Sequence, residues 1–184
     1  GMSDPQLANK HIEWDIHRNF EPRQMHVFRH YEHLYGASLI HVKSKQFLLL
    51  IGGCDISSWY KNSIGVLRYR YNPKSNEGKW IKIKVKGSDL NLYGVSCVLS
   101  ANEEYVIIGG GFVNDRKNWR TSADKPNNKI FVMDIRNKNE YKLRECAIKC
   151  PVDGGMNMNM VRMGGEIEHE LLVNGWIKKL FRTK

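Results

Sequence analysis

The chain lacks the features that usually mark a membrane protein or a secreted protein. Its longest apolar run, Phe47 to Ile51, has the length of one strand and falls far short of the roughly 20 residues of a transmembrane helix. No charged and then apolar leader stands at the N-terminus. No Asn-x-Ser/Thr glycosylation sequence occurs either. Together these absences predict a cytoplasmic protein.

Paired cysteines and catalytic motifs are also missing. Cys54, Cys97, Cys146 and Cys150 show no Cys-x-x-Cys spacing, which predicts free thiols in a reducing compartment. The sequence contains no Gly-x-Ser-x-Gly, no His-Glu-x-x-His and no phosphate-binding Gly-Lys-Ser/Thr. Methionines at alternate positions in Met156 to Met160 fit a strand with one buried face better than a Cu(I) site. We therefore expect no catalytic residue, no metal and no cofactor.

Acidic residues are in the minority, at 19 against 29 Lys and Arg, for a formal net charge of +10. Such a surplus attracts polyanions. Part of it lies in KWIKIKVK, Lys79 to Lys86, where apolar and lysine side chains alternate with the period of a strand. Ile81, Ile83 and Val85 are predicted to line one face, and Lys82, Lys84 and Lys86 the other. Lysines on an outer edge strand block pairing with other molecules, which explains several of these charges without a ligand.

The sequence repeats itself with a spacing of 58 residues. Leu34 to Gly53 (LYGASLIHVKSKQFLLLIGG) returns at Leu92 to Gly111 (LYGVSCVLSANEEYVIIGGG). Such a repeat indicates a supersecondary unit that stacks on its copies. The identical pairs are Leu34/Leu92, Tyr35/Tyr93, Gly36/Gly94, Ser38/Ser96, Gly52/Gly110 and Gly53/Gly111.

The repeat predicts an all-β chain in four parts: 1–33, a first unit at 34–91, a second unit at 92–150, and a partial third unit at 151–184. Alternating and β-branched residues predict four strands in each full unit and no amphipathic helix. In the partial parts, 11–16 and 156–163 are expected to be strands, 18–33 a connection, and 177–181 too short to finish a unit. The expected strands are 37–42, 46–51, 63–71 and 79–86 in the first unit, 95–100, 105–108, 129–135 and 141–146 in the second, and 156–163 and 170–174 in the third.

The unit resembles the kelch repeat. Its second strand is apolar and ends in Gly-Gly at Gly52 and Gly53, an aromatic follows in the third strand at Tyr69 or Tyr71, and Trp80 comes early in the fourth. The second copy has Gly110 and Gly111 in the same place, with Tyr141 where the kelch repeat usually has Trp. The resemblance implies a β-propeller whose blades are four-stranded antiparallel sheets, with di-glycines that let neighbouring blades approach closely.

The number of units departs from that family. A propeller needs at least four blades to close, and this sequence holds two full units with partial ones beside them. We therefore predict an incomplete propeller. The sequence leaves three arrangements open: a fragment of a longer protein, self-association that completes the ring, or sheets that stack without closing.

The longer loops are expected to share one rim, because connections in an antiparallel meander alternate between the two ends of the strands. That rim would carry Cys54 to Asn62, Gly87 to Asn91, and Phe112 to Asn128. Exposed Trp, Tyr and Arg dominate binding hot spots, and a loop of more than 12 residues is uncommon unless it is functional or disordered. The predicted partner-binding residues are Trp59, Tyr60, Lys61, Arg116, Lys117, Trp119 and Arg120.

These observations favour a non-catalytic protein-interaction module that binds an acidic protein segment through its basic and aromatic loops. The alternative is a fragment of a kelch-type enzyme of the oxidase or sugar-isomerase kind. Nucleic-acid binding through net charge is less favoured, because the lysines are spread along strands and are not clustered with stacking aromatics. The sequence does not identify the partner, the oligomeric state or any appended domain.

Overall fold

The protein is all-β in the computed structural model. The only helix among the described residues is a three-residue 3-10 turn, η1 (Lys43–Lys45), and none of them forms a helix long and apolar enough to cross a lipid bilayer. The described residues are 11–15, 21–25, 34–55, 62–63, 65–72, 74, 77–113, 125–149, 160–163, 168–173 and 176–182.

The first unit folds into a four-stranded antiparallel meander with the order β4-β5-β8-β9. The tight turn between β4 and β5 is η1, which is closed by a hydrogen bond that the Gln46 amide donates to the Lys43 carbonyl. Leu39 pairs with Leu50, and Leu50 pairs with Leu67, so these side chains share one face of the sheet. A strand is present at each of the four predicted places, although the one predicted at 79–86 ends at Lys82. The four strands are β4 (Ser38–Val42), β5 (Phe47–Ile51), β8 (Val66–Asn72) and β9 (Glu77–Lys82).

The second unit repeats this meander and adds a fifth strand. Its order is β10-β17-β16-β13-β12, in which β10 runs parallel to β17 and the other neighbours are antiparallel. β17 extends beyond the predicted range at its C-terminal end. The strands are β10 (Lys84–Gly87), β12 (Ser96–Leu99), β13 (Tyr105–Gly109), β16 (Lys129–Asp134) and β17 (Glu140–Lys149).

The segment KWIKIKVK is not one strand, as its alternation predicts, but two strands in two sheets. The chain leaves the first sheet after β9 and, past Ile83, joins the outer edge of the second sheet as β10. Ile83 is buried, Val85 is half-buried, and Ile81 is exposed, so the predicted apolar face holds only in part. The predicted edge position is confirmed, since β9 and β10 each end a sheet and their lysines are exposed.

Strands also form at both ends of the chain. β1 (His11–Asp15) confirms the strand expected there, but its partner β2 (Glu21–Met25) lies in the segment predicted to be a connection. The third unit contains β18 (Met160–Met163), β19 (Glu168–Val173) and β20 (Trp176–Arg182). The last of these pairs along β19, and the described third sheet has three strands, so 177–181 does not complete a four-stranded unit, as expected. Residues 156–159 of the predicted first strand lie outside the described part.

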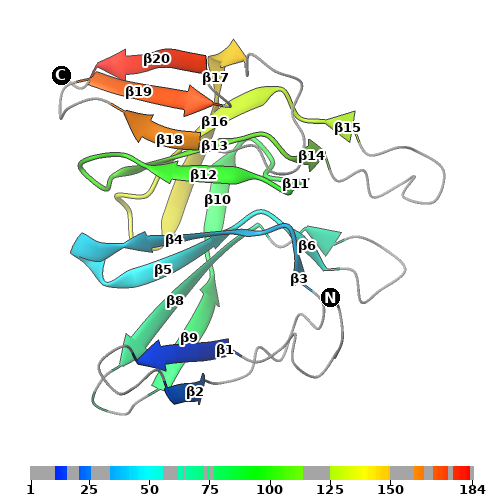
Figure 1. The fold of residues 1–184 in the computed structure, drawn as a ribbon. Coiled ribbons are helices and arrows are strands. Elements are labelled where there is room, and N and C mark those ends of the chain that lie inside the picture. Colours follow the sequence, from blue (N-terminus) through cyan, green and yellow to red (C-terminus); the bar gives the residue numbers. More distant parts are fainter. Residues whose placement is uncertain are drawn as a thin grey trace.

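The sheets stack with their first strands next to one another, as Figure 1 shows for β4, β12 and β18. Among the described strands, no sheet closes on itself and no closed ring of sheets forms. The fold class is therefore all-β with multistranded, mainly antiparallel sheets.

The hydrophobic core lies between the first and second sheets. We call the side of the first sheet that faces it the front face, made by Ile40, Val42, Phe47, Leu49 and Ile51, which are all less than 9% exposed. Because burial of apolar surface stabilises a fold by roughly 25 cal/mol per Å², this layer stabilises the contact between the two units. The second sheet meets it with Val106, Ile108, Phe131, Met133, Tyr141 and Leu143.

Candidate functional site

A small three-stranded sheet caps one end of the first unit. Its strands are β3 (Leu34–Tyr35), β6 (Cys54–Asp55) and β7 (Asn62–Ser63), in the order β3-β6-β7. β3 carries the start of the repeated LYG sequence, and β6 begins directly after the Gly-Gly pair. Residues 56–61 connect β6 to β7, so this sheet forms the base of the first predicted binding loop.

The second unit has an equivalent small sheet at the same end. Its strands are β11 (Leu92–Tyr93), β14 (Phe112–Val113) and β15 (Lys125–Pro126), in the order β11-β14-β15. β11 and β14 occupy the repeat positions of β3 and β6. Figure 1 shows β3, β6, β11, β14 and β15 together at one side of the molecule. Residues 114–124, which include most of the second predicted loop, connect β14 to β15.

Backbone hydrogen bonds join the two small sheets. The Gly94 amide donates to the Gly36 carbonyl at 2.7 Å, and the Gly53 amide donates to the Leu92 carbonyl at 2.8 Å. Gly53 has a φ of +86° and lies so close to Ala37 that an added Cβ would be 2.8 Å from the Ala37 Cβ. Only glycine fits that combination without strain. The first copy's Gly-Gly therefore contacts the second copy's LYG directly, and both halves of the repeated sequence meet here.

A row of aromatic rings crosses the same junction. The ring centroids of Tyr35 and Tyr93 are 5.9 Å apart, and those of Tyr93 and Phe112 are 5.5 Å apart with the rings nearly parallel. Both distances suit favourable aromatic pairs. Because Tyr35 belongs to the first small sheet and the other two belong to the second, the row connects the bases of the two loops.

Asn127 fixes the end of the longer loop. Its side chain is buried and donates from Nδ2 to the carbonyls of Gly110, at 2.9 Å, and Lys129, at 3.0 Å. Its Oδ1 accepts from the Lys129 amide, and its own amide donates to the Gly111 carbonyl. Sequence reasoning missed Asn127, because its bonds to Gly110 and Gly111 join residues that are 17 and 16 positions apart in the chain.

The predicted partner-binding residues lie in the two loops whose bases these sheets form. Trp59, Tyr60 and Lys61 belong to 56–61, and Arg116, Lys117, Trp119 and Arg120 belong to 114–124. All seven lie outside the described residues. The structure describes the residues at the two ends of the longer loop. Val113, where the loop leaves the sheet, is 38% exposed, and Lys125 and Pro126, where it rejoins the sheet, are also exposed. The third predicted rim segment, Gly87 to Asn91, leads into β11.

Two predicted structural residues of the first unit contact each other. Tyr69 on β8 pairs with Trp80 on β9, and their rings are 5.1 Å apart. Tyr69 is 7% exposed. The two therefore pack as an aromatic pair on the side of the first sheet that faces away from the core, at its outer half.

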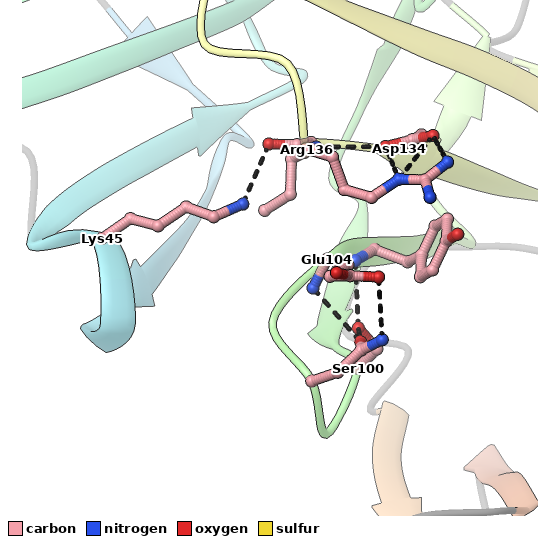
Figure 2. A network of polar contacts seen from close by, with 8 residues as sticks. Lys45, Ser100, Glu104, Asp134 and Arg136 are labelled. Atoms are coloured by element: carbon pink, nitrogen blue, oxygen red, sulfur yellow. Dashed lines mark hydrogen bonds and ion pairs between the residues drawn. The ribbon is translucent and has the colours of Figure 1, made fainter. Parts of the chain in front are cut away.

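The opposite end of the units carries short turns that are bonded to one another. Figure 2 shows Lys45 of the first unit donating from Nζ to the Ile135 carbonyl of the second, at 3.1 Å. In the same view Arg136 bonds to the Asp134 carboxylate, which lowers the pKa of that carboxylate. Nearby, the Ser44 amide donates to Glu103 at 2.7 Å, and hydrogen bonds from the Ser44 side chain and backbone lower the pKa of Glu103. Lys45 and Glu103 therefore bond across the two units, whereas the Arg136–Asp134 pair lies within the second unit.

The described cysteines Cys54, Cys97 and Cys146 are free thiols. Burial raises the pKa of the Cys97 thiol to about 12, so the thiol is poorly reactive. In the described parts of the chain, no group of three or more His, Cys, Asp or Glu side chains is arranged to hold a metal ion. In the comparisons with known proteins, no family model and no curated protein matches the chain.

Proposed function

We propose that this protein is a non-catalytic interaction module that binds an acidic segment of a partner protein through the loops 56–61 and 114–124. In the same proposal, its stacked sheets are kelch-type blades of an incomplete propeller. The observation that carries the binding proposal is the junction of the two small sheets. Both loops begin and end in strands of these sheets, and the aromatic row Tyr35–Tyr93–Phe112 connects their bases.

The sequence of the two loops supplies the chemistry. Together they contain two Trp, one Tyr, and the basic residues Lys61, Arg116, Lys117 and Arg120. Aromatic side chains provide large apolar contact area, and Arg binds carboxylates through two parallel hydrogen bonds. Exposed Lys125 adds a positive charge at the base of the longer loop. A partner segment that carries Asp or Glu near an apolar residue fits this combination.

A direct binding assay tests the proposal. Fluorescence anisotropy of a labelled oligoglutamate peptide that contains one Leu is measured with the wild-type protein, and an oligolysine peptide serves as the negative probe. We expect Trp119→Ala and Arg116→Glu each to weaken binding by about tenfold or more, which corresponds to about 1.4 kcal/mol. Neither change should alter the far-UV circular dichroism or the melting temperature.

Lys142→Glu is the matched control. Lys142 is an exposed residue on β17, and its substitution changes the net charge by the same amount as Arg116→Glu. If the loops form the site, Lys142→Glu binds as the wild type does. Equal losses for Arg116→Glu and Lys142→Glu would mean that net charge alone attracts the peptide, and the site assignment would be wrong.

A further inference from the structure

The first sheet has a second side, which we call the back face. It includes Leu39, Leu48 and Leu50 in its inner half, with exposed His41 beside Leu48, and Leu67 and Tyr69 in its outer half; these residues pair across β4, β5 and β8. Leu67 is 2% exposed and Tyr69 is 7% exposed, so the outer half is buried within the chain. Leu39, in contrast, is 58% exposed, and Leu48 and Leu50 are only half-buried. An aliphatic surface is thus left open at the inner half.

The 58-residue repeat shows what such a face contacts. The residues of the second unit equivalent to Leu48 and Leu50 are Val106 and Ile108, and both are 0% exposed. They are buried because the front face of the preceding unit packs on them. The residue equivalent to Leu39 is Cys97, which also packs against that core. The back face of the second unit therefore packs against the front face of the unit before it.

From this equivalence we propose that the back face of the first unit binds the terminal sheet of a second copy of this chain, in a head-to-tail contact. β18 lies beside β12 as β12 lies beside β4, so the third unit continues the stack in the same direction. Among the described sheets, β18-β19-β20 is the last in that direction, and the open inner half of the back face is at the other end, where Figure 1 also shows β1 and β2 beside the outer half of the first sheet. The association joins these two ends and goes beyond the proposed binding of an acidic partner through the loops.

Leu39 is central to this contact and dispensable for the fold of the single chain. A head-to-tail contact uses two different surfaces, so each chain offers one surface of each kind and the assembly grows into rings or longer stacks. A charge at Leu39 would then be removed from water in the contact, which opposes association strongly. Because Leu39 is 58% exposed within one chain, the same charge has little effect on the folding of that chain.

The first measurement is molar mass by light scattering during size-exclusion chromatography, over a roughly hundredfold range of concentration. We expect the wild-type protein to associate as concentration rises, and Leu39→Glu to weaken this association by about a hundredfold or more. Ile81→Glu is the matched control: Ile81 is 37% exposed on the same sheet but points to the front side, in register with Leu49 and Arg68. It should associate as the wild type does. A wild-type protein that stays monomeric throughout would overturn the proposal, as would equal effects of the two substitutions.

The second measurement tests the head-to-tail geometry. Labelled Leu39→Glu protein is mixed with unlabelled wild type, and its elution is followed by fluorescence. In a head-to-tail contact the variant still offers its terminal sheet, so it should join wild-type assemblies and limit their size. If the variant is excluded from them, two back faces meet in the wild-type contact, and the proposal is wrong.

Discussion

The back faces of the first and second units have equivalent sequences and opposite environments. Val106 and Ile108 are completely buried by the unit that precedes them, whereas Leu48 and Leu50 have no described sheet packed over them and stay half-exposed. The difference does not come from the strands, because both units form the same meander with the same register. It shows that burial in this molecule is set by position in the stack. Equivalent residues of the two units therefore contribute unequally to stability.

The largest difference between the two back faces is expected in the reactivity of a cysteine thiol at equivalent positions on them. Cys97 stands where the first unit has Leu39, and burial raises the pKa of its thiol to about 12. In a Leu39→Cys variant the new thiol is exposed, with a pKa near that of free cysteine. At pH 8 we expect it to react with iodoacetamide about tenfold or more faster than Cys97, which is only partly exposed. Peptide mass spectrometry of the dilute protein gives both rates, and similar rates would contradict the difference in burial.

Truncation of equivalent leucine and isoleucine side chains should give unequal losses of stability. Ile108→Ala removes a fully buried side chain and should lower the free energy of unfolding by about 2–5 kcal/mol. Leu50→Ala, at the equivalent position of the first unit, should lower it by only about 1 kcal/mol. Urea denaturation at low protein concentration measures both. Equal losses would show that the first back face is covered in solution.

Two glycines with similar backbone angles should differ in their tolerance of alanine. Gly36 has a φ of +66°, and a Cβ there would lie 2.6 Å from the Gly94 amide nitrogen of the other unit. Gly65 has a φ of +73° and open space around it. Gly65→Ala should therefore cost about 1–2 kcal/mol from backbone strain alone. Gly36→Ala adds a contact that forces the two units apart, so its melting temperature should be clearly the lower of the two.

The smallest effect is expected from the link between Ser44 and Glu103 across the two units. The pKa of Glu103 is lower in the folded protein than in the unfolded chain, because Ser44 donates hydrogen bonds to the carboxylate. Its contribution is thus complete above the unfolded pKa and is lost as pH falls through the folded pKa. Glu103→Gln should be slightly less stable than wild type at pH 7, and the two should converge between about pH 5 and pH 3. A difference that persists at pH 3 would mean that the charge is not the cause.

Local patterns were enough to predict most of the fold. Alternation and turn residues located a strand at each of the eight places in the two meanders, and the resemblance to the kelch repeat implied that Gly52 and Gly53 mark a close approach. The crossing at Ile83 could not be predicted, because KWIKIKVK alternates in the same way on both sides of it. The small sheets were also missed, since two-residue strands are too short for periodicity. β2 was missed because EPRQM has no apolar alternation.

The residues of the candidate loops could be predicted from the sequence, but the contacts at the bases of those loops could not. Trp59 and Trp119 stand out in any sequence as aromatic residues in polar loops. The aromatic row and Asn127, at the bases of the two loops, depend on contacts between residues that are far apart in the chain. For Tyr35 and Tyr93, identity across the repeat was visible, but their contact required the two copies to lie side by side.

Because the chain crosses from β9 to β10 at Ile83, the boundary between the two sheets does not coincide with the boundary between the two sequence repeats. A gene cut at the repeat boundary, between residues 91 and 92, would leave Lys84–Gly87 attached to the first copy and strip the second sheet of its outer strand. Neither fragment would then match a sheet of the intact protein. During synthesis the same strand leaves the ribosome before the sheet that it completes, and it must wait for β17 to be made. Duplicating such a repeat, or designing with it, requires a boundary at Ile83.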